Sequence, residues 1–334
     1  MNKNSLLKAL LLFCAAILVL SVTLGLKQVI GLPGYQFDDA GKYSSGGAEI
    51  AGPVKNLDID WLSGAVHIAY HSGDSVLLSE SSNKAIGADL RMRWRLDGDT
   101  LRVRFAKAGL RSNGNQEKEL TVTLPEGLVL REAAIGATSG NLDIPALEAD
   151  SLRLEVTSGD VSAAVKVRKL SSDASSGNLS LQLLGAAETI GAVSTSGSID
   201  VEAPGADRVR LSSTSGAIRA ALEYADEFDA SSTSGNILVA LGSLNKGELE
   251  SSSGGIRAEI GALGELKIDS TSGNVELLLP EHPGFRAEVD STSGRFEYSL
   301  PLTRKGDDYV CGGGSGSVDI ETTSGDVRIS ALPQ

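Results

Sequence analysis

The sharpest local feature of this sequence is a set of arginines that alternate with apolar residues on both sides of an Asp97-Gly98 pair. The five arginines are Arg91, Arg93, Arg95, Arg102 and Arg104. An Asp-Gly pair between two alternating runs is a strong signal for a β-hairpin. The predicted hairpin pairs Trp94 with Leu101 and Met92 with Val103 on its apolar face.

On the other face, this register sets Arg93 opposite Arg102 and Arg91 opposite Arg104. Like charges directly opposite one another destabilise a sheet, so something anionic must cover them. Carboxylates of an adjacent strand could do this, and so could a bound phosphate, sugar acid or lipid headgroup, because guanidinium groups bind such oxyanions well. We therefore predict an anion-binding or ligand-binding site at the five arginines, with internal pairing to carboxylates as the alternative.

Other residues give weaker signals for chemistry. His67 and His71 lie about 13 Å apart along a strand, which is too far to hold one metal ion. Asp58 and Asp60 fit a solvated strand better than a pair of glycosidase carboxylates, and Cys311 is predicted to be a small buried apolar residue. We expect no catalytic residue, no metal site and no cofactor.

These side chains must be positioned by a repeated element, because a ten-residue phrase built around Ser-Gly recurs from Ser139 to Ser324 with spacings of 19, 18, 20, 19, 19, 19, 19, 21 and 31 residues. A period near 19 predicts a repeat array. The residue two after each glycine is apolar, and two further on it is again apolar or Ala, which indicates β-strands. The serines are Ser139, Ser158, Ser176, Ser196, Ser215, Ser234, Ser253, Ser272, Ser293 and Ser324. No histidine recurs with them, so they lack the context of catalytic nucleophiles.

The glycine of each pair is predicted to form a structural corner, because it is constant while the residue after it varies. We expect this corner to need a positive φ, which favours glycine. A following Asn or Asp is typical of calcium-binding β-rolls, but Ala217, Gly255 and Arg295 interrupt any such ligand ladder. A second turn about ten residues after each Ser-Gly would complete a unit of strand, corner, strand and turn. The corner glycines are Gly140, Gly159, Gly177, Gly197, Gly216, Gly235, Gly254, Gly273, Gly294 and Gly325.

Two all-β architectures fit such units. In a parallel β-solenoid equivalent residues of successive coils stack about 4.8 Å apart, whereas in an antiparallel meander each Ser-Gly would be a hairpin loop. The residue two before the serine favours the solenoid, because in six consecutive repeats it is itself serine and would stack as a hydroxyl ladder. These residues are Ser194, Ser213, Ser232, Ser251, Ser270 and Ser291. The last coil, near Ala331, could cap the free end of the stack.

The N-terminal region differs from the repeats. Lys3 and Lys8 precede an uncharged apolar stretch, residues 9–26, so we predict a transmembrane signal anchor over 1–30 with the rest of the chain extracytoplasmic. Secretion after cleavage of this segment is the alternative. Residues 31–53 are predicted to be a tether, 54–125 a divergent β region with a capping coil around Trp61 and the arginine hairpin, and 126–334 the solenoid.

The formal net charge is −13. This acidic balance disfavours binding of nucleic acid by the body of the chain. The composition is compatible with a folded solenoid, since 41% of the residues are hydrophobic.

The sequence resembles the bacterial putative-adhesin β-strand repeat family, a group of domains of unknown function that includes membrane-anchored LiaG-like proteins. The resemblance rests on residues 57–64 (LDIDWLSG), on residues 118–125 (KELTVTLP) and on the Thr-Ser-Gly repeats that follow, and it covers the chain from about Val54 to its end. It implies a β-solenoid-like fold outside the membrane, an association with envelope stress and no established catalytic residue.

We therefore expect a non-catalytic, adhesin-like binding or scaffold protein of the cell envelope. Its candidate partners are a cell-wall polymer, an anionic lipid and a cationic peptide. A carbohydrate-active β-helix enzyme and a purely structural stalk are the alternatives; the enzyme would need aromatic platforms, and the repeats have few aromatic residues.

Overall fold

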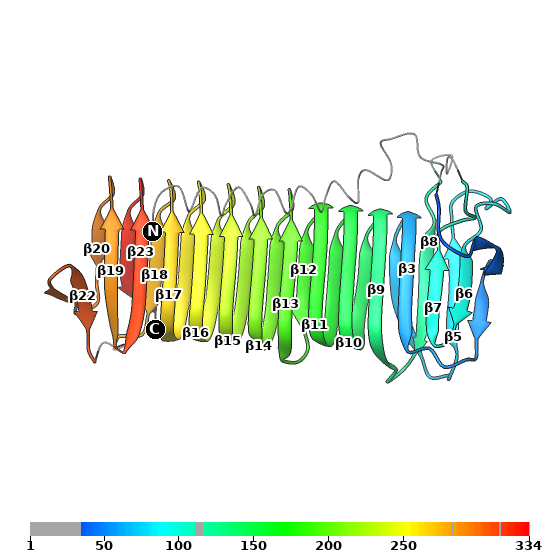
Figure 1. Cartoon of the computed structure of the whole chain (residues 1–334), viewed down its shortest axis with the longest axis horizontal. Coiled ribbons are helices and arrows are strands. Elements are labelled where there is room, and N and C mark those ends of the chain that lie inside the picture. The colour runs from blue at the N-terminus through cyan, green and yellow to red at the C-terminus, as the bar shows by residue number, and fades with distance from the viewer. Residues whose placement is uncertain (1–34, 111–115, 282–283, 314, 334) are drawn as a thin grey trace.

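The structure is a computed structural model that describes residues 35–110, 116–281, 284–313 and 315–333. These residues form a long rod of stacked β-coils (Figure 1), and the one helical element among them is a 3₁₀ turn, η1 (Ala40–Lys42). Successive coils pair in parallel, so that Leu142 lies beside Val161. The predicted all-β solenoid is confirmed, and the antiparallel meander is excluded for the repeats.

The middle of the rod contains ten strands that pair in parallel. They are β9 (Val129–Ser139), β10 (Leu142–Ser158), β11 (Val161–Ser176), β12 (Leu179–Leu183), β13 (Ala187–Ser194), β14 (Ile199–Ser213), β15 (Ile218–Ser232), β16 (Ile237–Ser251), β17 (Ile256–Ser270) and β18 (Val275–Leu279). In most of these coils one strand runs from one Ser-Gly corner to the next. The second turn that we predicted is therefore a bend within a continuous strand, although a break does separate β12 from β13.

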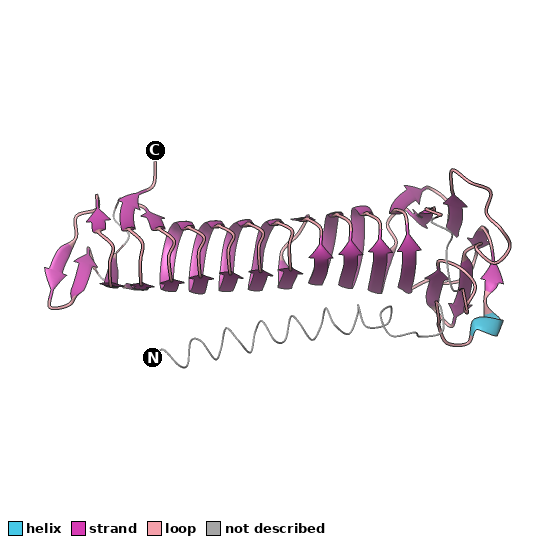
Figure 2. Ribbon diagram, turned by 90° about the horizontal axis from the view of Figure 1, so that it is seen from above, coloured by secondary structure: helices cyan, strands magenta, loops and turns pink. Residues whose placement is uncertain are grey.

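The core of the rod consists of straight columns of apolar side chains. The residue two after each corner glycine forms one such column, in which Ile199, Ile218 and Ile237 are fully buried and stack directly on one another. Phe296, in the outermost coil, is only partly buried. Figure 2 shows these coils from above, with their loops aligned along the rod.

The serine column is present, but its hydroxyls do not form the ladder that we predicted. Ser213, Ser232 and Ser251 lie in register in three successive coils. The hydroxyl of Ser232 accepts a hydrogen bond from the amide of Gly235 in its own corner at 2.9 Å, and Ser213 and Gly216 are joined in the same way at 2.9 Å. In these coils the serine therefore closes its own corner, whereas the buried hydroxyl of Ser291 in the outermost coil has no such bond.

The corner glycines are needed for a different reason from the positive φ that we expected. Among the ten, only Gly140 and Gly159 have φ values in the left-handed range, 154° and 144°. At Gly216 an added Cβ would lie 1.9 Å from the carbonyl oxygen of Gly197 in the neighbouring coil. Successive corners thus approach too closely for any side chain.

The C-terminal end of the rod does not follow the order of the chain. Its strands are β19 (Phe285–Ser291), β20 (Phe296–Tyr298), β21 (Thr303–Lys305), β22 (Asp308–Cys311), β23 (Gly316–Thr322) and β24 (Val327–Ala331). The last coil, β23 and β24, lies between β17 and β18 on one side and β19 and β20 on the other. Figure 1 accordingly places the C-terminus inward from β19 and β22.

The expectation that the last coil caps the rod is therefore wrong. The coil of β19 and β20 is outermost, and the antiparallel hairpin of β21 and β22 covers the edge of β19. This hairpin lies in the long interval between the corners at Ser293-Gly294 and Ser324-Gly325.

The N-terminal end has the same kind of order. Its strands are β1 (Ser44–Ser45), β2 (Ala48–Ile50), β3 (Asn56–Ser63), β4 (Val66–His71), β5 (Val76–Ser81), β6 (Arg93–Asp97), β7 (Thr100–Arg104) and β8 (Glu119–Pro125). The first coil, β3 and β4, lies between β9 and β10 on one side and β7 and β8 on the other. It is thus not the cap that we predicted, and Trp61 is fully buried inside the stack.

Part of the predicted tether is folded. β1 pairs with β6, and β2 pairs with β5. These short strands cover edges that would otherwise be free to pair with other chains. The predicted signal anchor, residues 1–30, lies outside the described residues, and the described residues include no helix that is long and apolar enough to cross a membrane.

Candidate functional site

The arginine hairpin is formed by β6 and β7, and its register differs from the predicted one by two residues. Arg93 lies opposite Arg104, and Arg95 lies opposite Arg102. Gly98, with a φ of 63°, is the first of two loop residues, which suits a tight hairpin turn. The shift by two preserves the alternation of faces, so arginines still face arginines, as the sequence predicted.

Carboxylates of neighbouring segments cover most of this arginine face. Asp58 of β3 lies 2.9 Å from Arg102 and 2.8 Å from Arg104, and Asp39 lies 2.9 Å from Arg95. Burial alone would lower the pKa of Arg104, but the hydrogen bonds and charge of Asp58 outweigh burial and raise it. These three arginines hold the strands at the end of the rod together.

Arg91 and Arg93 differ from the other three arginines, because within the described residues neither forms an ion pair with a carboxylate. Arg91 is exposed. Arg93 donates to the carbonyl oxygen of Ala88 at 3.0 Å, and its Nε atom is buried without a partner. Two of the five predicted arginines therefore keep unneutralised guanidinium groups near the N-terminal end of the rod.

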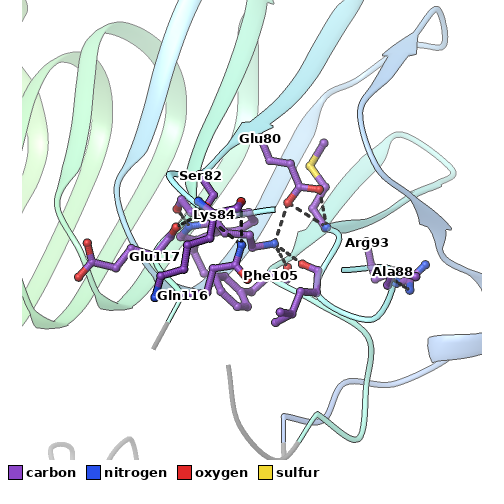
Figure 3. A network of polar contacts seen from close by, with 12 residues as sticks. Glu80, Ser82, Lys84, Ala88, Arg93, Phe105, Gln116 and Glu117 are labelled. Carbon is purple, nitrogen blue, oxygen red and sulfur yellow. Dashed lines mark hydrogen bonds and ion pairs between the residues drawn. The ribbon is translucent and has the colours of Figure 1, made fainter. Parts of the chain in front are cut away.

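Beside the hairpin lies a buried lysine, Lys118. Figure 3 shows the polar network of this region and labels Glu80 and Phe105, two of its partners. Its ammonium group is 2.7 Å from a carboxylate oxygen of Glu80 and also donates to the carbonyl oxygens of Leu90 and Phe105. It lies 4.8 Å from the ring centroid of Trp61 and 4.2 Å from that of Phe105. Burial lowers the pKa of Lys118 in spite of Glu80.

The two charged residues of this network were missed as candidates, although the sequence carries a signal for both. Lys118 precedes Leu120 and Val122 in a run with period two, and Glu80 follows Val76 and Leu78 in the same way. All the apolar members of these runs are buried. Since alternate residues of a strand face the same side, the two charges belong to the inward face. The buried pair fixes strands to one another, and its ammonium group has no access to a ligand.

The weaker candidates have structural partners. A ring nitrogen of His67 lies 3.3 Å from a carboxylate oxygen of Asp143, and one of His71 lies 2.7 Å from the carbonyl oxygen of Ser75. Cys311 is buried, as predicted. Asp58 forms ion pairs with Arg102 and Arg104.

The Asn and Asp residues after the corner glycines connect successive coils. A side-chain oxygen of Asn141 accepts a hydrogen bond from the amide of Asp160 at 2.9 Å, and Asp160 accepts in turn from the amide of Asn178 at 2.8 Å. Asn236 accepts from the amide of Gly255 at 2.8 Å. These side chains thus hold the corners of neighbouring coils together.

Comparison with known proteins finds similarity to a family and to several solved structures. The sequence profile of the Toastrack DUF4097 family matches residues 54–330. A putative adhesin from Parabacteroides merdae is 14% identical, with a TM-score of 0.46, and the similarity covers 88% of this chain and 97% of that one. A putative adhesin from Parabacteroides distasonis is 14% identical, with a TM-score of 0.45 and coverage of 86% and 97%. No curated protein matches the chain.

Proposed function

The chain belongs to the Toastrack DUF4097 family, and from this premise we propose that it is a membrane-anchored, extracytoplasmic binding or scaffold protein of the bacterial cell envelope. In this role it would act without catalysis, as an adhesin-like component in the response to envelope stress. The observation that carries the proposal is the uninterrupted stack of coils, which repeats exposed side chains in straight columns along a rod. Such columns suit a ligand that is itself a repeating polymer, because many weak contacts can act together.

We assign binding of the anionic part of such a ligand to Arg91 and Arg93. Arg95, Arg102 and Arg104 are engaged by carboxylates, whereas the first two have guanidinium groups without ion pairs in the described residues. The ligand class is an anionic wall polymer or an anionic lipid surface. A cationic peptide bound to acidic faces of the rod is the alternative.

Co-sedimentation tests this assignment. The full chain is mixed with isolated cell walls, with anionic vesicles and with a cationic antimicrobial peptide across a salt series. Binding to the anionic surfaces should weaken as salt rises and should be lost when Arg91 and Arg93 are both changed to Ser. A matched control changes Arg210 and Arg219, two exposed arginines of the middle coils, and should bind as the unchanged chain does.

Other outcomes would redirect the proposal. Binding to the peptide alone would move the site to the acidic faces. Absence of binding to any of the three would favour a structural stalk.

The membrane anchor has its own test. The full chain with a C-terminal tag is expressed in bacterial cells, and external protease is added to cells with a permeable wall. Loss of the tag together with recovery of the chain in the membrane fraction is the expected result. A chain found free in the medium would favour secretion after cleavage.

A further inference from the structure

Along much of the rod, opposite charges face one another between neighbouring coils. Arg208 lies 2.6 Å from Glu227, and Arg257 lies 2.5 Å from Glu276. Arg208 and Glu227 are exposed, and such a pair contributes little to stability. One region of the rod largely lacks this pairing of opposite charges between neighbouring coils.

This pattern fails on four adjacent strands, β16, β17, β23 and β19. Their register places Glu248, Lys267, Asp319 and Glu288 in one column and Glu250, Asp269, Glu321 and Asp290 in the next. We call these eight residues the acidic grid. Seven of the eight are carboxylates on strands about 4.8 Å apart, and like charges at such positions destabilise a sheet.

Lys267 is the one basic residue among the eight of the grid. Its ammonium group lies 2.5 Å from the Oδ2 atom of Asp269 and 4.0 Å from Glu248. In the described residues no other basic side chain forms an ion pair with the grid. Burial, together with the charges of Glu248 and Asp269, raises the pKa of Glu250.

Asp269 provides an independent observation that points to a ligand at the grid. The residue is only 7% exposed, and its Oδ1 atom is buried without a hydrogen-bond partner. An unpaired carboxylate oxygen in such a place is costly and calls for an unseen partner such as an ion. Since Lys267 contacts only the other oxygen, it does not supply this partner.

The geometry of the neighbouring carboxylates fits one class of ion. Glu248, Glu250 and Asp269 each offer one carboxylate oxygen, and these atoms all lie within 4.8 Å of one another. Oxygen ligands surround Ca²⁺ at about 2.3–2.6 Å and Mg²⁺ at about 2.0–2.1 Å. These oxygens are close enough together for one ion to contact all three. Ca²⁺ accepts flexible arrangements of oxygen ligands, whereas Mg²⁺ demands near-ideal octahedral geometry, so side chains fixed by a sheet favour Ca²⁺.

We propose that the acidic grid binds a divalent cation of the Ca²⁺ class through Glu248, Glu250 and Asp269. The ion joins β16 to β17 and reduces the repulsion within the grid. It also stabilises the place where the last coil of the chain enters the stack. With three carboxylates and water as ligands, affinity belongs to the range of about 10⁻⁴–10⁻³ M seen for extracellular calcium modules.

The test is a calcium titration of the full chain, kept in non-ionic detergent and first treated with a chelator. Isothermal titration with CaCl₂ should show saturable binding, and the midpoint of thermal unfolding should rise with calcium because the ion binds the folded state. Glu250→Gln and Asp269→Asn should each weaken binding at least tenfold. Glu202→Gln, which removes an exposed carboxylate of β14 outside the grid, should leave it unchanged.

One further variant and one further ion test the proposed ligands and the choice of Ca²⁺. Lys267→Gln should tighten calcium binding several-fold, because it removes a competing positive charge. MgCl₂ should bind at least tenfold more weakly than CaCl₂, and equal affinity would overturn the assignment to the Ca²⁺ class.

The proposal is overturned if the unchanged chain shows no saturable binding, or if Glu250→Gln and Asp269→Asn bind as it does. Both variants relieve repulsion, so we expect them to fold. Circular dichroism checks this, and Glu250→Gln, at a partly exposed position, carries the test if Asp269→Asn does not fold.

Discussion

The corner glycines set the distance between coils. At Gly216, Gly235 and Gly254 a Cβ atom would lie 1.9–2.0 Å from a backbone oxygen of the preceding corner. Neither atom can rotate away, because the obstacle is backbone. A side chain at such a position must separate two coils and break the hydrogen bonds between them.

We therefore predict that Gly216→Ala is strongly destabilising, with a loss of about 3 kcal/mol or more, at the upper end of what overpacking costs. Gly185→Ala is the matched control, because its Cβ would meet only the Cγ atom of Lys166 at 3.5 Å. That change should alter stability by less than about 0.5 kcal/mol. Urea unfolding measures both, and equal effects of the two changes would contradict the close-approach explanation.

Lys118 and Glu80 act as a buried pair at the N-terminal end of the rod. Lys118→Met leaves the Glu80 carboxylate with hydrogen bonds from the Met92 amide but without a positive charge. Removal of one partner of a buried ion pair typically costs about 3–5 kcal/mol, and we expect a loss of that size in urea unfolding. The double variant Glu80→Gln, Lys118→Met should recover most of it, and a double variant as unstable as the single one would show that the pair is not the cause.

The sequence predicted the arginine face but not how it is used. Arginines alternate with apolar residues in both strands of the hairpin. They therefore face one another in any register that differs from the predicted one by an even number of residues. For this reason the arginine face was predicted although the individual partners are shifted by two. Asp97 of the same strand pairs with Arg95, but the other carboxylates that cover the face, Asp58 and Asp39, are distant in the sequence. No local pattern specifies such contacts, because they depend on which strands become neighbours.

At the level of elements, the first coil of the chain (β3 and β4) and the last coil (β23 and β24) both lie inside the stack and not at its ends. β3 pairs with strands on both sides, and so does β23. Terminal coils in a simple solenoid have one free edge and fray or pair with other chains. Here the free edges belong to short strands, since β20 and β21 have three residues each.

The repeat period predicted the coils of the regular part but not this order at the ends. A period specifies which residues stack within neighbouring units, and Ile199, Ile218 and Ile237 obey it. The long interval before Ser324 indicated an insertion. It could not show that the last coil, β23 and β24, inserts between two earlier coils. The position of the last coil depends on which exposed strand edge it covers. The strands at these edges have the same alternation of apolar residues, so the pattern does not distinguish them.

The acidic grid predicts an unusual dependence of stability on pH. Burial raises the pKa of Glu250 and of Asp319, and the charge of Asp319 raises that of Glu288. The folded state therefore binds protons at a higher pH than the unfolded chain, in which these groups have pKa values near 4.5, 3.8 and 4.5. Stability should rise as the pH falls from neutrality into this window.

Urea unfolding without calcium at pH 7, 6 and 5 measures this effect. The chain should become more resistant as the pH falls, and the double variant Glu250→Gln, Glu288→Gln should show a flatter profile. Exposed carboxyls with lowered pKa values, such as Glu227 and Asp326, reverse the trend only at more acidic pH. A loss of stability between pH 7 and pH 5 would contradict the prediction.

At the scale of the whole molecule, stability is a sum over coils and the contacts between neighbours. One coil in the regular part can therefore be removed without changing the architecture. Deleting residues 218–236 joins two equivalent corners and brings Ile199 beside Ile237, so the apolar column remains continuous. Removing residues 316–334 is different, because that coil separates two others and buries Val318, Ile320, Val327 and Ile329.

We predict that the internal deletion retains a cooperative unfolding transition with a modestly lower midpoint, whereas the C-terminal truncation loses far more stability. Each of the four buried side chains that it removes contributes about 1.5–3 kcal/mol, and the coil of β19 and β20 loses its parallel neighbour. Circular dichroism and urea unfolding of the two shortened chains measure the difference, and size-exclusion chromatography detects pairing through the opened edges of β17 and β18. If the truncated chain unfolds at the same urea concentration as the internally deleted one, the last coil is an ordinary terminal repeat in solution and does not close the stack.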